Sequence, residues 1–448
     1  MIANRPTLFM LHALGGSSTA FDPIRLALGD AFDVIAIDLP GFGDRDTKAG
    51  TTVQDMSNVV VEVIRTRGAT RWLLVGHSMG AKIATVVAAR AMNGEPGLFG
   101  LMGVVLLAGS PASAEPMDEA RREQMIGWVE HGSIDDASAS AFIEANVGAP
   151  LAPKEQAMAI SDLKRCSPYA WRAWLERGSR EDWSAEVGTL SLPTLVIVGS
   201  EDEDLGEAGQ RATNLQTYPS AELISLEGAG HLLPLERSEA VASAIARFWH
   251  DIANRAPAVP PATAQLINSD RVTRRTRALL AQRALPDASP TRPGVLTPSQ
   301  LATLRAIAAR VVPQAEPGID LAARLDAYLA EGGSDGWRFA DMPCDTEAYA
   351  AALDALSGFG AIDRSDQDQC LDAIAEGTYT TENTGFTPEQ FQRWFEDTRN
   401  DLVRIWLSHP ATAAQIGFHG FANGGDVHRP QGFDQLAAGE RDVWEHAV

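Results

Sequence analysis

Mainly apolar runs alternate with stretches of helical periodicity over the first half of the chain. The runs lie at residues 8–11, 32–39, 72–75, 101–108, 194–199 and 222–227. Between the second and third runs, residues 53–66 place apolar side chains at helical spacing. Strands of a parallel sheet are buried on both faces, so they are apolar throughout and alternate with the helices that cover them. The pattern therefore predicts an α/β fold with a mostly parallel sheet.

This alternation is interrupted at residues 111–192, where only helical patterns occur. They lie at residues 119–130, 137–144, 154–163 and 169–177. A long insertion between two strands predicts a helical cap over the carboxyl edge of the sheet. The cap is rich in aromatic residues, namely Trp128, Phe142, Tyr169, Trp171, Trp174 and Trp183. These residues line a substrate pocket or form the cap's own core, and the sequence leaves both interpretations open.

A proline-rich segment at residues 255–296 predicts a linker, although its basic stretch at 271–283 favours a short helix. The region beyond it is helical throughout, with patterns at residues 297–312, 319–330, 347–356, 367–375 and 388–407 and a glycine-rich tail. We therefore expect an α/β domain at residues 1–254, the linker, and a C-terminal all-helical domain at residues 297–448.

Composition and charge narrow the possible partners. The chain has 448 residues, of which 45% are hydrophobic, so it can form more than one core. Its formal net charge of −22 argues against nucleic acid or an anionic membrane as a partner. The N-terminal residues lack the basic and apolar regions of a signal peptide, and no apolar stretch reaches the length of a membrane span. These features favour a cytoplasmic protein.

The most informative motif follows the third strand. Gly76-His77-Ser78-Met79-Gly80 fits G-x-S-x-G, and the apolar residues 81–92 continue as a helix. A sharp turn from strand to helix strains the backbone of its apical residue and exposes that side chain. The motif is weak by itself, but its position between a strand and a helix predicts that Ser78 is a nucleophile.

A nucleophilic serine needs a histidine base and a carboxylate that orients the base. Asp202 follows the fifth strand and His231 follows the sixth, so both are expected at the same sheet edge as Ser78. Asp204 is the alternative acid, because Asp202 lies in an acidic run. The glycine-containing turn at residues 12–16 follows the first strand, where a backbone amide can complete an oxyanion hole with the amide after the nucleophile.

These four motifs, in this order and at these strand ends, give residues 1–254 a clear resemblance to the α/β-hydrolase superfamily. The resemblance implies that the amides of Leu14 and Met79 form the oxyanion hole and that His12 is structural. Two features depart from the family pattern. Ala13 replaces the usual glycine, and the chain begins at the family's third strand.

The C-terminal region resembles a second family. The segment LTPSQLATLRAIAARVVP at residues 296–313, the sequence PGID at 317–320 and GFANGGD at 420–426 are similar to the gluconate 2-dehydrogenase subunit 3 family over residues 297–435. That resemblance implies a small helical accessory subunit of a flavin-dependent dehydrogenase. No nucleotide-binding glycine fingerprint occurs, so we expect this chain to carry no cofactor.

Four histidines near the C-terminus raise the question of a metal site. They are His409, His419, His428 and His446, with Asp426 nearby. None forms a pair with the i,i+4 spacing of helical metal ligands, so we expect no metal.

The sequence thus predicts a serine hydrolase that cleaves a carboxylic ester or lactone, with a possible flavin-dependent dehydrogenase partner. Two alternatives remain open. The chain is a non-catalytic accessory subunit, or the hydrolase fold performs other chemistry such as carbon–carbon hydrolysis or perhydrolysis.

Overall fold

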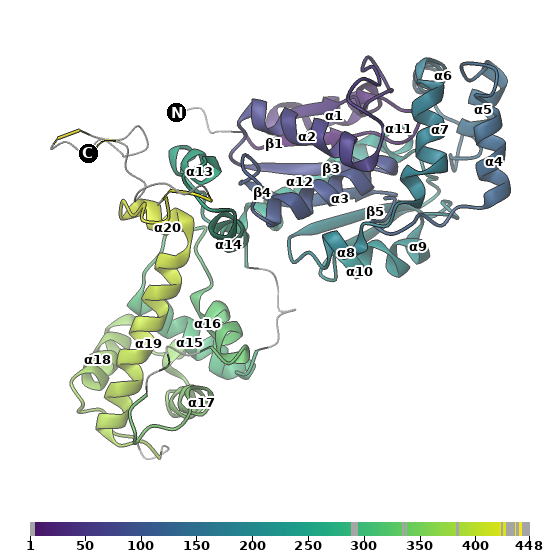
Figure 1. Cartoon of the computed structure of the whole chain (residues 1–448). Helices are drawn as coiled ribbons and strands as arrows, with labels where there is room; N and C mark the ends of the chain where they lie inside the picture. The colour runs from purple at the N-terminus through teal and green to yellow at the C-terminus, as the bar shows by residue number, and fades with distance from the viewer. Residues whose placement is uncertain are drawn as a thin grey trace. The chain divides into compact units, whose positions relative to one another are not determined.

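A computed structural model of the chain describes residues 5–287, 294–333, 336, 338–381, 385–422, 424–426, 435 and 439–440. The chain forms two compact units (Figure 1). The first contains Met1–Asn254, Pro260–Leu285 and His419–Val448, and the second contains Arg255–Val259 and Pro286–Phe418. The first unit is therefore assembled from three separate stretches of sequence.

A six-stranded, wholly parallel sheet lies at the centre of the first unit, in the order β2-β1-β3-β4-β5-β6. The strands are β1 (Thr7–Leu11), β2 (Asp33–Ile37), β3 (Trp72–His77), β4 (Leu101–Leu107), β5 (Thr194–Gly199) and β6 (Glu222–Leu226). Every residue of β1, β3, β4 and β5 is buried. The predicted α/β fold with a parallel sheet is confirmed.

Helices cover both faces of this sheet. The chain moves outward from β1 to β2 and then back past β1 to β3, and right-handed crossovers place the helices of these two connections on opposite faces. Accordingly α1 (Asp22–Leu28) contacts α12 (Ser238–Asp251), whereas α2 (Val53–Arg67) contacts α3 (Met79–Met92). A capping box between Thr52 and Asp55 starts α2, and Gly68 ends it with φ 64°.

The predicted cap lies between β4 and β5. It contains α4 (Glu119–Gly127), α5 (Asp136–Glu144), α6 (Pro153–Arg165), α7 (Pro168–Glu176) and α8 (Ser184–Val187). Trp171 is fully buried, its indole donates to the Met125 carbonyl at 2.8 Å, and its ring contacts Trp128 and Phe142. The aromatic residues therefore form the core of the cap to a large extent.

Shorter elements complete the unit after β5. They are α9 (Glu207–Ala212), α10 (Asn214–Thr217) and α11 (Leu233–Glu236). Elsewhere in the chain, 3-10 turns occur at Ser18–Phe21, Gly29–Ala31, Gly178–Arg180, Ala253–Arg255 and Phe359–Ala361, the last of them in the second unit. Thr213 separates α9 from α10, because its φ of −126° and ψ of −86° are not helical.

The proline-rich stretch at residues 255–296 contains two helices of the first unit, α13 (Pro261–Asn268) and α14 (Arg274–Ala284). Arg277 of α14 is buried, and its guanidinium donates to the carbonyls of Ile267 and Gly94, both at 2.7 Å. Asp426, from the far end of the chain, accepts a hydrogen bond from the Arg274 amide at 2.7 Å. These helices consequently pack as part of the hydrolase unit.

Helices are the regular elements of the second unit, and no strand occurs among its described residues. Its helices are α15 (Pro298–Val311), α16 (Leu321–Ala330), α17 (Asp345–Ala355), α18 (Arg364–Ala375), α19 (Pro388–Ser408) and α20 (Pro410–Gln415). Thr297 and Thr387 begin α15 and α19 with capping boxes followed by proline. Trp394 of α19 lies at 1% exposure in the core of the bundle. Across the part of the chain that the structure describes, no helix is both long and apolar enough to cross a membrane.

Candidate active site

The turn between β3 and α3 holds Ser78 in a strained backbone conformation. Its φ of 51° and ψ of −117° are unusual for a residue other than glycine. The two flanking glycines are required by space. A Cβ on Gly76 would lie 2.5 Å from the Ala81 Cα, and one on Gly80 would lie 2.2 Å from the Leu11 carbonyl oxygen. The tight packing of β1 against α3 thus keeps the backbone of Ser78 in its strained conformation.

His231 and Asp202 meet at the same edge of the sheet. The Nδ1 of His231 donates to Oδ2 of Asp202 at 2.7 Å, and the two side chains are 14% and 4% exposed. Burial lowers the pKa of His231, but the negative charge and hydrogen bond of Asp202 outweigh it, and the pKa rises above 6.5. Burial raises the pKa of Asp202, but the charge and hydrogen bond of His231 lower it further, below 3.8.

Asp204, the alternative acid, has a different partner. Its carboxylate forms an ion pair with Arg121 of α4. Arg121 also donates to the side-chain oxygen of Asn146 at 3.2 Å. The structure therefore brings Asp202 to His231, while Asp204 connects the loop after β5 to the cap.

His77, beside Ser78, supports the loop of His231. Its Nε2 donates to the carbonyl oxygen of His231 at 2.8 Å. Burial lowers the pKa of His77 to about 3, so this histidine is neutral at physiological pH. It holds the loop that carries His231.

The turn after β1 carries Leu14, whose amide is expected in the oxyanion hole. The buried His12 ring holds the start of this turn, because its Nδ1 donates to the Ala13 carbonyl at 2.7 Å and its Nε2 accepts from the Leu39 amide at 3.0 Å. Burial lowers the pKa of His12, which favours the neutral ring and agrees with a structural role. The second expected donor, the amide of Met79, belongs to the first residue of α3 and has no acceptor within that helix.

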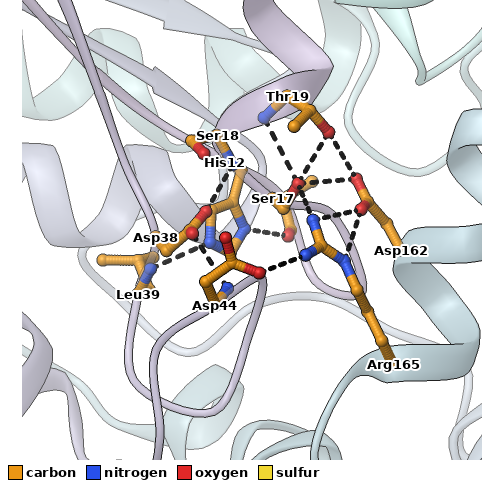
Figure 2. Close-up of polar contacts among 10 residues, drawn as sticks. His12, Ser17, Ser18, Thr19, Asp38, Leu39, Asp44, Asp162 and Arg165 are labelled. Carbon is orange, nitrogen blue, oxygen red and sulfur yellow. Dashed lines mark hydrogen bonds and ion pairs between the residues drawn. The ribbon is translucent and has the colours of Figure 1, made fainter.

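A polar network joins this turn to the cap (Figure 2). Asp162 of α6 is 4% exposed, and its carboxylate accepts from Ser17 at 2.7 Å and from Thr19 at 3.2 Å. Arg165 lies beside it and donates to Asp162 and Ser17, and also to Asp44 in the loop after β2. The turn after β1 is consequently held from the cap side as well as from the sheet side.

Glu236 performs a similar task for the loop of His231, and the sequence motifs do not identify it. Its carboxylate accepts from the amides of Gly230 and Leu232, on either side of His231, at 3.0 and 3.1 Å. It also accepts from the Gly148 amide of the cap at 2.8 Å. A glutamate five residues after the proposed base is the signal that was available in the sequence.

Ser78, Asp202 and His231 line one cavity of about 340 Å³, together with Leu14. The cap contributes Phe142 and Trp174 to its wall, so the aromatic residues of the cap serve both expected purposes. A smaller cavity of about 40 Å³ with mainly apolar lining residues lies next to the first, and the two share Ala13, Leu14, Phe142 and Leu232.

The C-terminal histidines do not form a metal centre within the described residues. His409 and His419 are described, whereas His428 and His446 lie outside the described part of the chain. No three His, Cys, Asp or Glu side chains among the described residues converge as metal ligands.

Comparison with known proteins identifies the class of both regions. Residues 8–244 match the model of the alpha/beta hydrolase family, and residues 298–423 match the model of gluconate 2-dehydrogenase subunit 3. The chain belongs to the alpha/beta hydrolase family and carries in addition a gluconate 2-dehydrogenase subunit 3 domain.

Similar proteins are distant and match the hydrolase region. The 2-succinyl-6-hydroxy-2,4-cyclohexadiene-1-carboxylate synthase of Serratia proteamaculans is 28% identical over 255 residues, which cover 55% of this chain and 94% of that protein. The 2-(acetamidomethylene)succinate hydrolase of Mesorhizobium japonicum is 25% identical and covers 54% and 87%, respectively. Among solved structures, an esterase from Exiguobacterium antarcticum has a TM-score of 0.49 at 17% identity, covering 54% of this chain and 91% of that one.

Proposed function

We propose that the hydrolase unit cleaves a carboxylic ester or lactone through Ser78, His231 and Asp202. The hydrogen bond between His231 and Asp202, in the cavity that Ser78 lines, is the observation that carries this proposal. Asp202 orients the ring so that its Nε2 is free to accept the Ser78 proton. The elevated pKa of His231 increases its strength as a base.

In the proposed reaction, Ser78 Oγ attacks the substrate carbonyl while His231 takes the proton. The amides of Leu14 and Met79 stabilise the oxyanion, and His231 then returns the proton to the leaving alkoxide. Water, deprotonated by the same histidine, hydrolyses the acyl-enzyme and regenerates Ser78.

The charge of the cavity favours an uncharged substrate. Five acidic residues line it, and Arg121 is the one lysine or arginine among the described lining residues. Because Arg121 already pairs with Asp204, a substrate carboxylate would meet net repulsion. The synthase of Serratia proteamaculans and the hydrolase of Mesorhizobium japonicum are named for carboxylate compounds, and we propose that this chain differs from these two in acting on neutral ones.

Labelling with a fluorophosphonate probe tests the assignment of the nucleophile. We expect the full chain to be labelled and the Ser78→Ala variant to remain unlabelled. A chain that resists labelling and hydrolyses neither aryl esters nor lactones would support the alternative of a non-catalytic accessory subunit.

The subunit 3 domain is the reason to propose a protein partner for this chain. We propose that it binds a flavin-dependent dehydrogenase, as its family resemblance implies. Oxidation of a sugar at its anomeric carbon yields a lactone, which is a neutral cyclic ester. A hydrolase attached to such an enzyme would open the lactone at an effective concentration of about millimolar. Affinity purification from the host should recover a flavoprotein, and the pure chain should hydrolyse aldonolactones faster than the spontaneous rate.

The names of two relatives are the reason to consider other reactions, because one is a synthase and another is a hydrolase of an acetamidomethylene compound. If Ser78 is labelled but neither esters nor lactones are hydrolysed, carbon–carbon cleavage or perhydrolysis becomes the better assignment.

A further inference from the structure

A short segment of the cap, residues 146–148 after α5, lies against the loop that carries His231. The carbonyl oxygen of Asn146 accepts from the amide of His231 at 2.8 Å and from the amide of Leu232 at 3.1 Å. The carbonyl oxygen of His231 in turn accepts from His77, at the end of β3, at 2.8 Å. The peptide groups before and after His231 are therefore both fixed, by the cap and by β3.

Two glycines permit the close contact between the cap segment and this loop. A Cβ on Gly148 would lie 2.6 Å from the carbonyl oxygen of Gly228 and 2.9 Å from the nitrogen of Gly230. A Cβ on Gly230 would lie 2.6 Å from the nitrogen of Gly148 and 2.7 Å from the Cα of Val147. All these neighbours are backbone atoms, so rotation of a side chain cannot relieve either overlap. The loop must therefore move if Gly148 gains a side chain.

The cap segment is itself held at both of its ends. The Nδ2 of Asn146 donates to the Phe142 carbonyl of α5 at 2.7 Å, and its Oδ1 accepts from Arg121 of α4 at 3.2 Å. At the other end, the Gly148 amide donates to the carboxylate of Glu236 at 2.8 Å. Residues 146–148 thus form a fixed support for the loop of His231.

We infer that residues 146–148 of the cap are a positioning element for the proposed base. They place the backbone of His231 so that its Nδ1 meets Asp202 at 2.7 Å and its Nε2 can exchange a proton with Ser78. The cap then takes part in catalysis in addition to lining the cavity. This inference rests on the proposed function and deepens it. A displaced histidine transfers protons poorly, and general acid–base catalysis contributes about 10²–10⁴ to a rate.

Gly148→Ala tests the inference, because the added Cβ displaces the loop of His231 and Gly148 is not one of the described residues that line the cavity. We would measure kcat/KM for 4-nitrophenyl butyrate and for ethyl butyrate, and the rate at which a fluorophosphonate labels Ser78. The 4-nitrophenolate group leaves without a proton, whereas the ethoxide group needs one from His231.

The two esters should respond differently to this substitution. We expect kcat/KM of Gly148→Ala to fall about tenfold on the 4-nitrophenyl ester and about 100-fold on the ethyl ester, and labelling to slow about tenfold. A smaller folded fraction would lower the values for both esters by the same factor. The ratio of the two values therefore distinguishes the position of His231 from the stability of the fold.

Gly127→Ala is the matched control. Gly127 is also an exposed glycine of the cap without a positive φ, and a Cβ there would meet no atom within 4 Å. It should leave both kcat/KM values and the labelling rate unchanged. Asn146→Ala removes the side-chain hydrogen bonds of the segment and adds no bulk, so it should change the ester ratio in the same direction by a smaller factor.

An unaltered ester ratio in Gly148→Ala would overturn the inference, while hydrolysis by the wild type would leave the proposed function intact. If Gly148→Ala does not fold, an unaltered ratio in Asn146→Ala would have the same meaning. If the wild type is labelled but hydrolyses neither ester, equal labelling rates in the wild type and Gly148→Ala would overturn it. A wild type that hydrolyses no ester or lactone and resists labelling at Ser78 would instead contradict the proposed function itself.

Discussion

At the scale of single residues, Ser78 should account for nearly all hydrolysis. Ser78→Ala removes the nucleophile but adds no bulk at the strained turn, so the fold should persist. We expect kcat on an aryl ester to fall by about 10³ or more. Steady-state kinetics and a thermal melt of the same preparation check both statements. Activity within tenfold of the wild type would rule out the assignment.

We expect very different effects from substitution of the two aspartates in the loop after β5. Asp202→Asn removes the charge that orients His231, and we expect a loss of roughly 10⁴ in kcat. Asp204→Asn breaks the partly exposed ion pair with Arg121 and should cost less than tenfold. The two variants keep nearly the same shape and serve as controls for each other. A reversed order of effects would exchange their roles.

The pH dependence of hydrolysis should report His231. The histidine must be neutral to accept the Ser78 proton, and its pKa is raised above 6.5. The kcat/KM of the free enzyme should therefore decrease as the pH falls through an apparent pKa above 6.5. In Asp202→Asn this limb should move to lower pH, because the stabilising charge is lost. A pH–rate profile from 5 to 9, about the range in which histidine titrates, tests both expectations.

At this scale the sequence predicts which residues are candidates for the site better than it predicts which side chains each of them contacts. Ser78, Asp202 and His231 are recognisable because each follows an apolar strand, and parallel strands bring their carboxyl ends together. The choice between Asp202 and Asp204 depends on Arg121, which lies 83 residues from Asp204 in the chain.

At the scale of elements, the contact between α6 and the turn after β1, which carries Leu14, should contribute to catalysis (Figure 2). Asp162→Ala removes the acceptor of Ser17 and Thr19 and leaves Arg165 without its buried partner. The Leu14 amide would then be less well positioned for the oxyanion. We expect kcat to fall by about 10–100-fold with little change in KM, because removal of one oxyanion donor costs about 10²–10³.

Asp136→Ala is a suitable control, because Asp136 forms an exposed ion pair with Lys164 on the outside of the cap, with side chains 75% and 44% exposed. It should leave kcat unchanged. Asp162→Asn should recover part of the rate, since its amide oxygen still accepts from Ser17. If Asp162→Ala lowers the melting temperature but not kcat, the network is structural only.

The strands were predictable because they are continuous apolar runs, whereas some helices were not. The α13 helix begins at Pro261 within a proline-rich stretch that suggests an extended linker. Proline at the first helical position has no hydrogen bond to lose, so the same residue permits both outcomes. Packing decides between them. Thr263, Ala264, Leu266 and Ile267 are all buried.

At the scale of the whole molecule, the chain leaves the hydrolase unit after Leu285 and returns to it at His419. The Arg271 carbonyl accepts from the Gly424 amide at 3.1 Å, and Asp426 accepts from the Arg274 amide. The second unit is thus connected at both ends to the first. A single cut between residues 285 and 297 would therefore leave the two pieces joined by the tail through these hydrogen bonds.

The hydrolase should depend on α13 and α14 for stability. Without them, the carbonyls of Asn93 and Gly94 lose the donors that Arg274 and Arg277 provide at 3.0 and 2.7 Å. The Phe99 amide also loses the side-chain oxygen of Asn268, which accepts from it at 2.8 Å. Hydrogen bonds to a charged donor contribute roughly 1.5–3 kcal/mol. A fragment of residues 1–287 should therefore melt several degrees above a fragment of residues 1–254.

Both fragments should retain the site, because Ser78, Asp202 and His231 all lie before residue 254, and the alignment with the synthase of Serratia proteamaculans covers 94% of that protein with 55% of this chain. We expect equal kcat on an aryl ester at low temperature and earlier inactivation of the shorter fragment on heating. Arg277→Met in the full chain measures how much the buried guanidinium alone contributes to the melting temperature. Arg275→Met, on the same helix, is its control. Identical melting of the two fragments would show that α13 and α14 contribute nothing to the hydrolase. Loss of activity in both would show that residues after 287 support the catalytic cavity.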